Sequence, residues 1–353
     1  MIVNGEQFVF PTERKMQKFL RGAALFLIFV MLSCSLLCSC SSTKDENNIS
    51  EDATVLYASG KEVSYGLFRY FFLNYKAEYS KEEIAADPDA VYKKIEDDTI
   101  ESIQGLYAVL KMCEDKGISI NDDEIKSQVS ETIDSIKQQY INEENDKSGE
   151  RGYKQDLAAN FMTDSVLRFL VSVDLCETAL YDALTEEGGD MSEDEETVRG
   201  ILFGDEYIRV VQIYINAENG ESYETNKKTA ETVLAKAKSG VDFDTLIGNY
   251  SNDYTMTTDG YYICHGFMAE EFEDVAYSLE IGEVSEILEL DDGFHIIKRL
   301  QKEDEYLEDN YENLRDRYLS CVFYKKLDAV ALTIDITKGE KYADIDFSLI
   351  ALS

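Results

Sequence analysis

The chain has 353 residues, of which 34 are Lys or Arg and 71 are Asp or Glu, so its formal net charge near neutral pH is −37. This length is typical of about two domains, and the hydrophobic fraction of 44% supports packed cores and excludes a wholly disordered chain. The charge excludes a general nucleic-acid binder, which needs clustered Lys and Arg to contact phosphates. It also argues against a basic face lying on anionic lipid.

Residues 1–39 have the pattern of a targeting segment. An uncharged apolar run covers residues 23–37 and follows four basic residues, Arg14, Lys15, Lys18 and Arg21. The run of about 15 residues is short for a membrane span and fits the core of a signal peptide. It ends in Leu37-Cys38-Ser39-Cys40, which resembles a bacterial lipobox with Cys40 as the residue that receives the lipid. A plain secretory signal and an N-terminal anchor helix are the alternatives.

The remaining cysteines and the acidic runs give no indication of a cofactor or a metal. Neither a CxxC nor a metal-like spacing occurs among Cys113, Cys176, Cys264 and Cys321. Buried free thiols are the simplest interpretation, and the pairing of these cysteines stays open because an extracytoplasmic compartment permits disulfides. The acidic run at 192–196 lacks the Asp-x-Asp-x-Asp-Gly spacing of a calcium loop. We therefore expect no cofactor and no metal.

A polar tether at 40–52 is followed by a helical region at 53–205. Apolar residues recur at steps of three and four over 92–113, which predicts a helix with one buried face, and Gly117 follows as a helix stop. Similar stripes cover 125–140 and 162–184. Core packing explains all of them.

The pattern changes near residue 206. Residues 208–215 are β-branched and aromatic, which predicts a strand. Helices are predicted at about 223–238, 243–250 and 269–279, and strands near 284–289 and 294–300, with a tight-turn signal at Asp291-Asp292-Gly293. The helical pattern resumes over 303–331, and the tail at 342–352 alternates like a strand.

A series of short stretches in this α/β segment carries a resemblance. In chain order the stretches are 211–215 (VQIYI), 236–243 (KAKSGVDF), 250–253 (YSND), 259–262 (DGYY), 266–276 (GFMAEEFEDVA), 279–285 (LEIGEVS) and 293–298 (GFHIIK). Each is weak alone, but their order and spacing resemble a parvulin-type (PpiC-like) peptidyl-prolyl cis–trans isomerase domain over about 207–301. The flanking layout resembles the PrsA-type foldase lipoproteins of Gram-positive bacteria.

The resemblance implies an α+β fold, in which a small α/β parvulin domain is inserted into a helical SurA/PrsA-like chaperone module. The expected parts are a lipoprotein signal peptide at 1–39, the tether at 40–52, a helical chaperone region at 53–205, a parvulin-like domain at 206–302, and a C-terminal helix and tail at 303–353 that pack on the N-terminal region.

The resemblance also implies a set of site residues. Rotation about an X–Pro bond crosses a barrier of ~18–20 kcal/mol without breaking a covalent bond, so the site must hold the proline ring and favour the twisted amide. Met268 and Phe272, four residues apart on a predicted helix, match the family's ring-binding pair; ordinary core residues are the alternative. His295 and Asp253 match polar positions near the amide. Gln212 stands where the family usually has His, and it can donate and accept a hydrogen bond but cannot titrate.

Two functions from different classes follow. The first is a membrane-anchored foldase on the extracytoplasmic face of the cell membrane, acting as isomerase and chaperone on unfolded or nascent secreted polypeptides. The alternative is a binding-only holdase with a degenerate parvulin domain, which Gln212 and the shortened glycine turn at 259–262 favour. A solute-binding lipoprotein would show an alternating strand–helix pattern, which is absent here.

Overall fold

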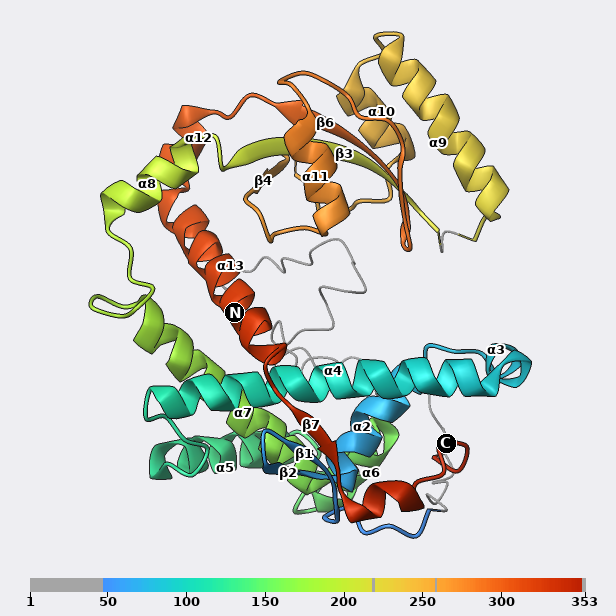
Figure 1. The fold of residues 1–353 in the computed structure, drawn as a ribbon, viewed down its shortest axis with the longest axis vertical. Coiled ribbons are helices and arrows are strands. Elements are labelled where there is room, and N and C mark those ends of the chain that lie inside the picture. The colour runs from blue at the N-terminus through green and yellow to red at the C-terminus, as the bar shows by residue number, and fades with distance from the viewer. Residues whose placement is uncertain (1–46, 218–219, 258, 351–353) are drawn as a thin grey trace. The chain divides into compact units, whose positions relative to one another are not determined.

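The computed structural model describes residues 47–217, 220–257 and 259–350, so the predicted signal peptide and Cys40 lie outside the described residues. Figure 1 shows the elements, which in chain order are β1 (Thr54–Ala58), β2 (Lys61–Ser64), α2 (Tyr65–Lys76), α3 (Lys81–Ala86), α4 (Pro88–Asp115), α5 (Asp123–Gln138), α6 (Glu150–Ala159), α7 (Asp164–Thr185), α8 (Glu195–Phe203), β3 (Ile208–Asn216), α9 (Tyr223–Lys238), α10 (Phe243–Tyr250), β4 (Tyr261–Ile263), α11 (Glu270–Ser278), β5 (Leu288–Leu290), β6 (Gly293–Leu300), α12 (Asp304–Asp309), α13 (Tyr311–Ala331), β7 (Ile336–Lys338) and the 3₁₀ helix η1 (Glu340–Asp344). Within the described ranges no helix is long and apolar enough to cross a membrane.

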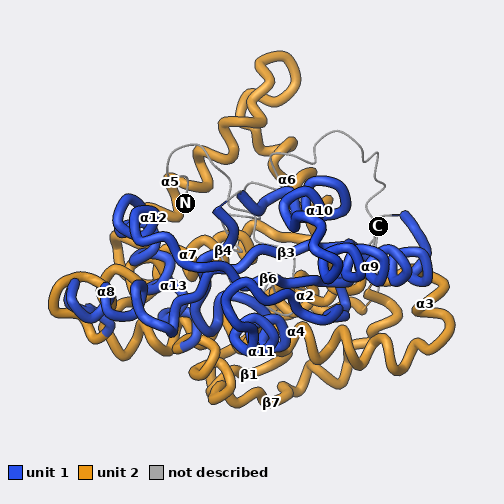
Figure 2. The backbone as a smooth tube through the Cα atoms, turned by 90° about the horizontal axis from the view of Figure 1, so that it is seen from above, with its two compact units in different colours: residues 1–17, 191–325 blue, residues 18–190, 326–353 orange. Residues whose placement is uncertain are grey.

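The chain forms two compact units, which Figure 2 colours separately. Of the described residues, 191–325 form unit 1, and 47–190 together with 326–350 form unit 2. The second division falls within α13. The sequence placed the domain boundaries at 205/206 and 302/303, so unit 1 includes more helix than the predicted parvulin-like segment.

Unit 2 is built mainly from the predicted apolar stripes. The stripe at 92–113 lies in α4, which begins with the N-cap Asp87 and a proline at its first position. Ile95, Ile103 and Leu106 of this helix are buried, and α4 packs against α2 and α7. The predicted helix at 162–184 corresponds to α7.

A small sheet in unit 2 joins the two ends of the described chain. β1 pairs antiparallel with β2 on one side and with β7 on the other. The sequence missed the β1–β2 hairpin, whose turn residues Ser59 and Gly60 both have positive φ, at 47° and 81°. The strand predicted at 342–352 is wrong, because no strand forms over 342–350, the part of that range that the structure describes.

Aromatic packing explains the alternation in that tail. The segment after β7 forms η1, and Phe347 then lies with its ring centroid 5.0 Å from that of Phe72, in a stacked orientation. Tyr342 meets Phe68 edge to face at 5.7 Å. The alternating apolar residues therefore anchor an irregular segment to α2 instead of lining a strand.

Unit 1 contains a four-stranded antiparallel sheet in the order β4-β3-β6-β5. The helices predicted at 223–238 and 243–250 are α9 and α10 with the same bounds, and α11 is the helix predicted at 269–279. On β3, Val211 and Ile213 point to the core under α9 and α10, whereas Val210 points to the core shared with α11. The sheet thus has one helical layer on each face.

The core on the α11 face extends beyond the predicted parvulin-like segment. It contains Leu202 of α8, Leu307 of α12 and Leu314 of α13 together with Phe272 of α11. Lys302 also ties these parts together, because its Nζ donates to the carbonyl oxygens of Leu202, at 3.0 Å, and Gly204 at the end of α8. Burial lowers the pKa of this lysine. These contacts explain why unit 1 runs from 191 to 325.

Candidate functional site

Two neighbouring strands place a glutamine and a histidine side by side. In the β3–β6 register Gln212 pairs with Ile297 and Tyr214 with His295, so Gln212 and His295 are diagonal neighbours on the α11 face. They are 1% and 2% exposed. Nδ1 of His295 lies 2.9 Å from Oε1 of Gln212. Because an amide oxygen only accepts, the hydrogen is assigned to Nδ1, which donates.

The loop after α10 brings an aspartate to the same place. β4 pairs with β3 only at residues 208–210, and beyond that point the loop bonds the free edge of β3. The Tyr214 amide donates to Oγ of Ser251 at 3.1 Å, and the Asn252 amide donates to the Tyr214 carbonyl at 2.6 Å. Asp253 is thereby held beside Gln212, whose Nε2 donates to its Oδ2 at 2.8 Å.

The carboxylate of Asp253 acts as an acceptor on all sides. Its Oδ2 also accepts from the Tyr261 hydroxyl at 2.8 Å, and its Oδ1 accepts from the amides of Thr255 and Met256 at 3.1 and 3.2 Å and from Oγ1 of Thr255 at 2.8 Å. Burial, with the charge of Asp253, raises the pKa of Tyr261. The carboxylate therefore fixes the glutamine amide, and the glutamine in turn fixes the histidine ring.

The apolar pair predicted to hold proline borders this network. Met268 precedes α11 and Phe272 lies on it; they are 8% and 2% exposed and belong to one core cluster. The Phe272 ring lies 6.0 Å from the His295 ring, nearly perpendicular at 86°, and Tyr214 stacks on the same imidazole at 4.8 Å. The structure thus connects four of the five predicted parvulin-site residues by direct contacts and places the fifth, Met268, in the same core cluster as Phe272.

Three further residues of the site were missed by the sequence reasoning. Oδ1 of Asp292 lies 3.0 Å from Nε2 of His295, although its Asp-Asp-Gly context signalled only a turn. Tyr261 was part of a matched stretch but received no role, and Tyr214 is recognisable only from the strand register. His265, the other histidine, is largely exposed and stacks on Tyr277 at 3.9 Å.

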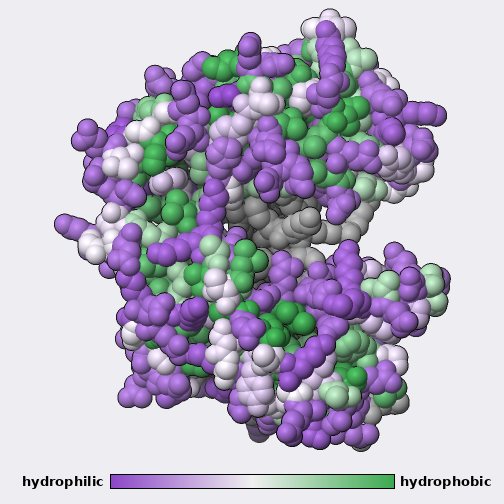
Figure 3. Space-filling model, in the orientation of Figure 1, coloured by the Kyte–Doolittle hydropathy of each residue, from purple (hydrophilic) through white to green (hydrophobic). Residues whose placement is uncertain are grey.

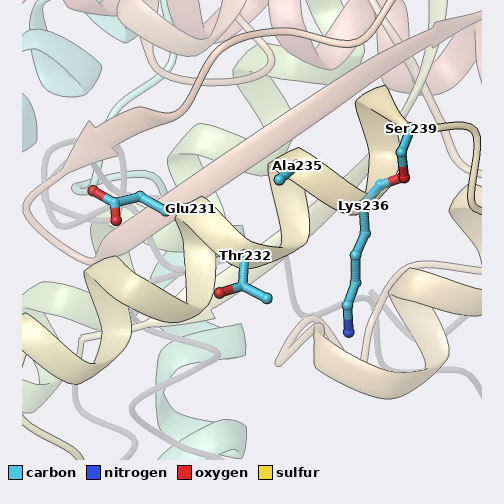
Figure 4. A pocket seen from close by; sticks show the side chains of 5 residues that line it. All are labelled: Glu231, Thr232, Ala235, Lys236 and Ser239. Carbon is cyan, nitrogen blue, oxygen red and sulfur yellow. The ribbon is translucent and has the colours of Figure 1, made fainter.

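Surface shape does not locate this site. Hydrophilic side chains cover much of the face seen in Figure 3. A shallow depression of about 520 Å³ lies along α9, and it is lined by Glu231, Thr232, Ala235, Lys236 and Ser239 (Figure 4). None of these residues belongs to the network. Within the described residues no cluster of three or more His, Cys, Asp or Glu side chains has a metal-binding arrangement.

The comparison with family models defines the class of protein. The model of the PPIC-type PPIase domain, a rotamase, matches residues 212–301. This range begins at Gln212 and contains Asp253, Met268, Phe272 and His295. Unit 1 therefore carries a parvulin-type domain, and the protein is a peptidyl-prolyl cis–trans isomerase.

Curated relatives extend the match to most of the chain. The foldase protein PrsA of Geobacillus kaustophilus is 30% identical over 233 residues, which are 63% of this chain and 76% of that protein. Foldase protein PrsA of Bacillus subtilis is 34% identical over 125 residues, or 34% and 41% of the two chains. A crystal structure of PrsA from Bacillus anthracis shares 22% identity and covers 65% of this chain and 95% of that one, with a TM-score of 0.32. On the first of these matches the chain belongs to the PrsA foldase family, which confirms the resemblance and makes it a foldase chaperone.

Proposed function

We propose that this foldase is anchored through a lipid on Cys40 and works on the extracytoplasmic face of the cell membrane, on unfolded or nascent secreted polypeptides. The lipobox-like sequence after an uncharged apolar run supports the anchor. The strongly negative charge supports a body that stands away from an anionic membrane.

A fatty-acid labelling experiment tests the anchor. Cells that express the wild type should incorporate an alkyne fatty acid into the protein, and Cys40→Ala should abolish the label. Cys38→Ala is the matched control and should keep the label. Lipidation at Cys38 would require a small residue directly before it, and the chain has Leu37 there. Equal labelling of the wild type and Cys40→Ala would contradict the proposal.

For isomerisation we assign the proline ring to Met268 and Phe272 and the orientation of the site to the polar network. The observation that carries this assignment is the edge-to-face contact of Phe272 with His295, which joins the apolar cluster to the hydrogen-bonded chain. Both ring nitrogens of His295 and the side-chain amide of Gln212 bond to protein groups. The network therefore positions a ring and does not need to transfer a proton.

The apolar setting supplies the catalytic effect in this scheme. A planar amide has a larger dipole than a twisted one, because twisting removes resonance. Transfer into a water-poor slot therefore disfavours the planar ground state more than the twisted transition state. Tight packing around the proline ring lets the chain on one side of the bond rotate while the ring is held.

An isomerisation assay on a proline-containing peptide tests the slot. Phe272→Ala removes an apolar contact worth about 2–3 kcal/mol, so kcat/KM should fall by about 30- to 150-fold. Phe294→Ala is the matched control, since Phe294 is 3% exposed but packs on the opposite face of β6. An equal loss in both variants would show a general effect on stability and refute the slot.

The same assay separates the two functions left open by the sequence. Gln212, in place of the family's histidine, is the observation that favours a binding-only holdase. A wild-type rate no higher than the uncatalysed rate would establish that alternative. Suppression of aggregation of a proline-free client should be unchanged in Phe272→Ala, because we assign chaperone activity to unit 2.

A further inference from the structure

Besides Asp253, unit 1 contains a buried carboxylate on α11 that has no part in the proposed site. Glu273 follows Phe272 directly and is 5% exposed. Burial of an ionised carboxylate costs several kcal/mol unless hydrogen bonds or an opposite charge compensate it. The groups that compensate Glu273 therefore indicate what it holds.

Its partners all come from the loop between β4 and α11. The Gly266 amide lies 2.8 Å from both Oε1 and Oε2, and the Met268 amide donates to Oε1 at 2.8 Å. Nδ1 of His265 lies 3.5 Å from Oε2. Gly266 has φ +97°, a conformation that suits glycine and turns its amide inward. The loop is wound around the carboxylate.

The loop enters the helix without a side-chain cap. Ala269 is the N-cap of α11 and makes no side-chain capping bond. Phe272 is held by the helix, whereas Met268 lies one residue before the cap. The hydrogen bond from the Met268 amide to Glu273 therefore links the two halves of the proposed proline slot.

We propose that Glu273 is the positioning residue of the proline slot: by binding the amides of Gly266 and Met268, its carboxylate sets where Met268 lies next to Phe272. This inference rests on the proposed role of Met268 and Phe272. It assigns no contact between Glu273 and the substrate. Its effect passes through Met268, and this distinguishes it from the polar network around His295.

The isosteric change Glu273→Gln tests the proposal in the full-length protein. It keeps the size of the side chain but loses the charge and places an NH₂ group among amide donors. KM for a proline peptide should rise about tenfold, the effect of losing one charge-assisted hydrogen bond, while kcat changes less. Glu271→Gln is the matched control, since Glu271 is an exposed glutamate on the same helix, and it should leave both constants unchanged.

A double-mutant cycle asks whether Glu273 acts through Met268. In a Met268→Ala background, Glu273→Gln should add little further loss, because the side chain that it positions is gone. Equal losses in both backgrounds, or a Glu273→Gln variant that behaves like Glu271→Gln, would overturn the proposal. Loss of activity in Phe272→Ala with no effect of Glu273→Gln would leave the slot intact and refute only the positioning role.

Amide exchange in the wild type keeps the proposal falsifiable if Glu273→Gln fails to fold. The amides of Gly266 and Met268 should exchange much more slowly than the amide of Tyr254, a loop residue that is 87% exposed. Exchange of all three at similar rates would overturn it.

Discussion

Replacing Gln212 with leucine should reveal how much the buried polar network contributes to stability. The change removes two hydrogen bonds, from Nε2 to Asp253 at 2.8 Å and from His295 to Oε1 at 2.9 Å. Asp253 keeps its bond from Tyr261, but Nδ1 of His295 loses its acceptor inside the protein. An orphaned buried group costs ~1–3 kcal/mol, and the leucine recovers part of that through apolar burial. We therefore expect the free energy of unfolding of unit 1 to fall by about 1–2 kcal/mol.

Hydrogen exchange measured by mass spectrometry is the suitable assay, because the chain has no Trp and unfolding of two units is not a single transition. Peptides from β3 and β6 report the opening free energy of unit 1, and peptides from α4 serve as an internal reference. Gln301→Leu is the matched control, since Gln301 is an exposed residue just after β6. If Gln212→Leu lowers the opening free energy of β3 and β6 no more than Gln301→Leu does, the network does not stabilise unit 1 as described.

The remaining predictions concern activity, pH and domain limits. Gln212→His should raise the isomerisation rate or leave it unchanged, because it introduces the family's usual residue; a rate tenfold below that of the wild type would contradict this. Burial alone would raise the pKa of Glu96. Hydrogen bonds from Lys338, at 2.8 Å, and from Tyr342 outweigh this effect, and the net result is a pKa below the usual value. The ionised Glu96 therefore stabilises unit 2 above the unfolded pKa of ~4.3, and this stabilisation is lost as the pH falls. Glu96→Gln should lower the free energy of unfolding of unit 2 by about 1 kcal/mol at pH 7. Urea titrations should show that this difference disappears in acid. In a fragment of residues 191–325, the amide hydrogens of β3 should still exchange slowly with solvent. In a fragment of residues 206–302 they should exchange fast, because only the longer fragment keeps the core residues of α8 and α13.

Local patterns predicted the elements that depend on local chemistry. The bounds of α9 and α10 were predictable because Ser222 and Asp242 are N-caps whose side chains accept from the first turn. The parvulin-like site was accessible because its motifs keep their order and spacing. Met268 and Phe272 were expected on one helix, but the structure places Met268 one residue before the N-cap of α11, so that part of the prediction is wrong.

Features that depend on distant partners were not predictable. Asp292 appeared to be only a turn residue, since its contact with His295 depends on how β6 leaves the turn. Glu273 looked like one more charge in an acidic helix, and only the loop wound around it shows that it is buried. The wider limits of unit 1 follow from contacts between α8 and Lys302, about 100 residues apart in the chain.

The pairing of β1 with β7 has a consequence for the order of folding. Residues 54–58 and 336–338 belong to one sheet, so this sheet of unit 2 cannot form until residues 336–338 have been synthesised. The entropy lost in closing a loop grows with its flexible length. If unit 1 has already folded, most of the chain between β1 and β7 is no longer flexible, and the entropy cost of pairing these strands is smaller. We expect vectorial synthesis to complete unit 1 before unit 2. A molecule truncated shortly before residue 336 would then keep a folded unit 1 but would lack β7 and the closed sheet of unit 2.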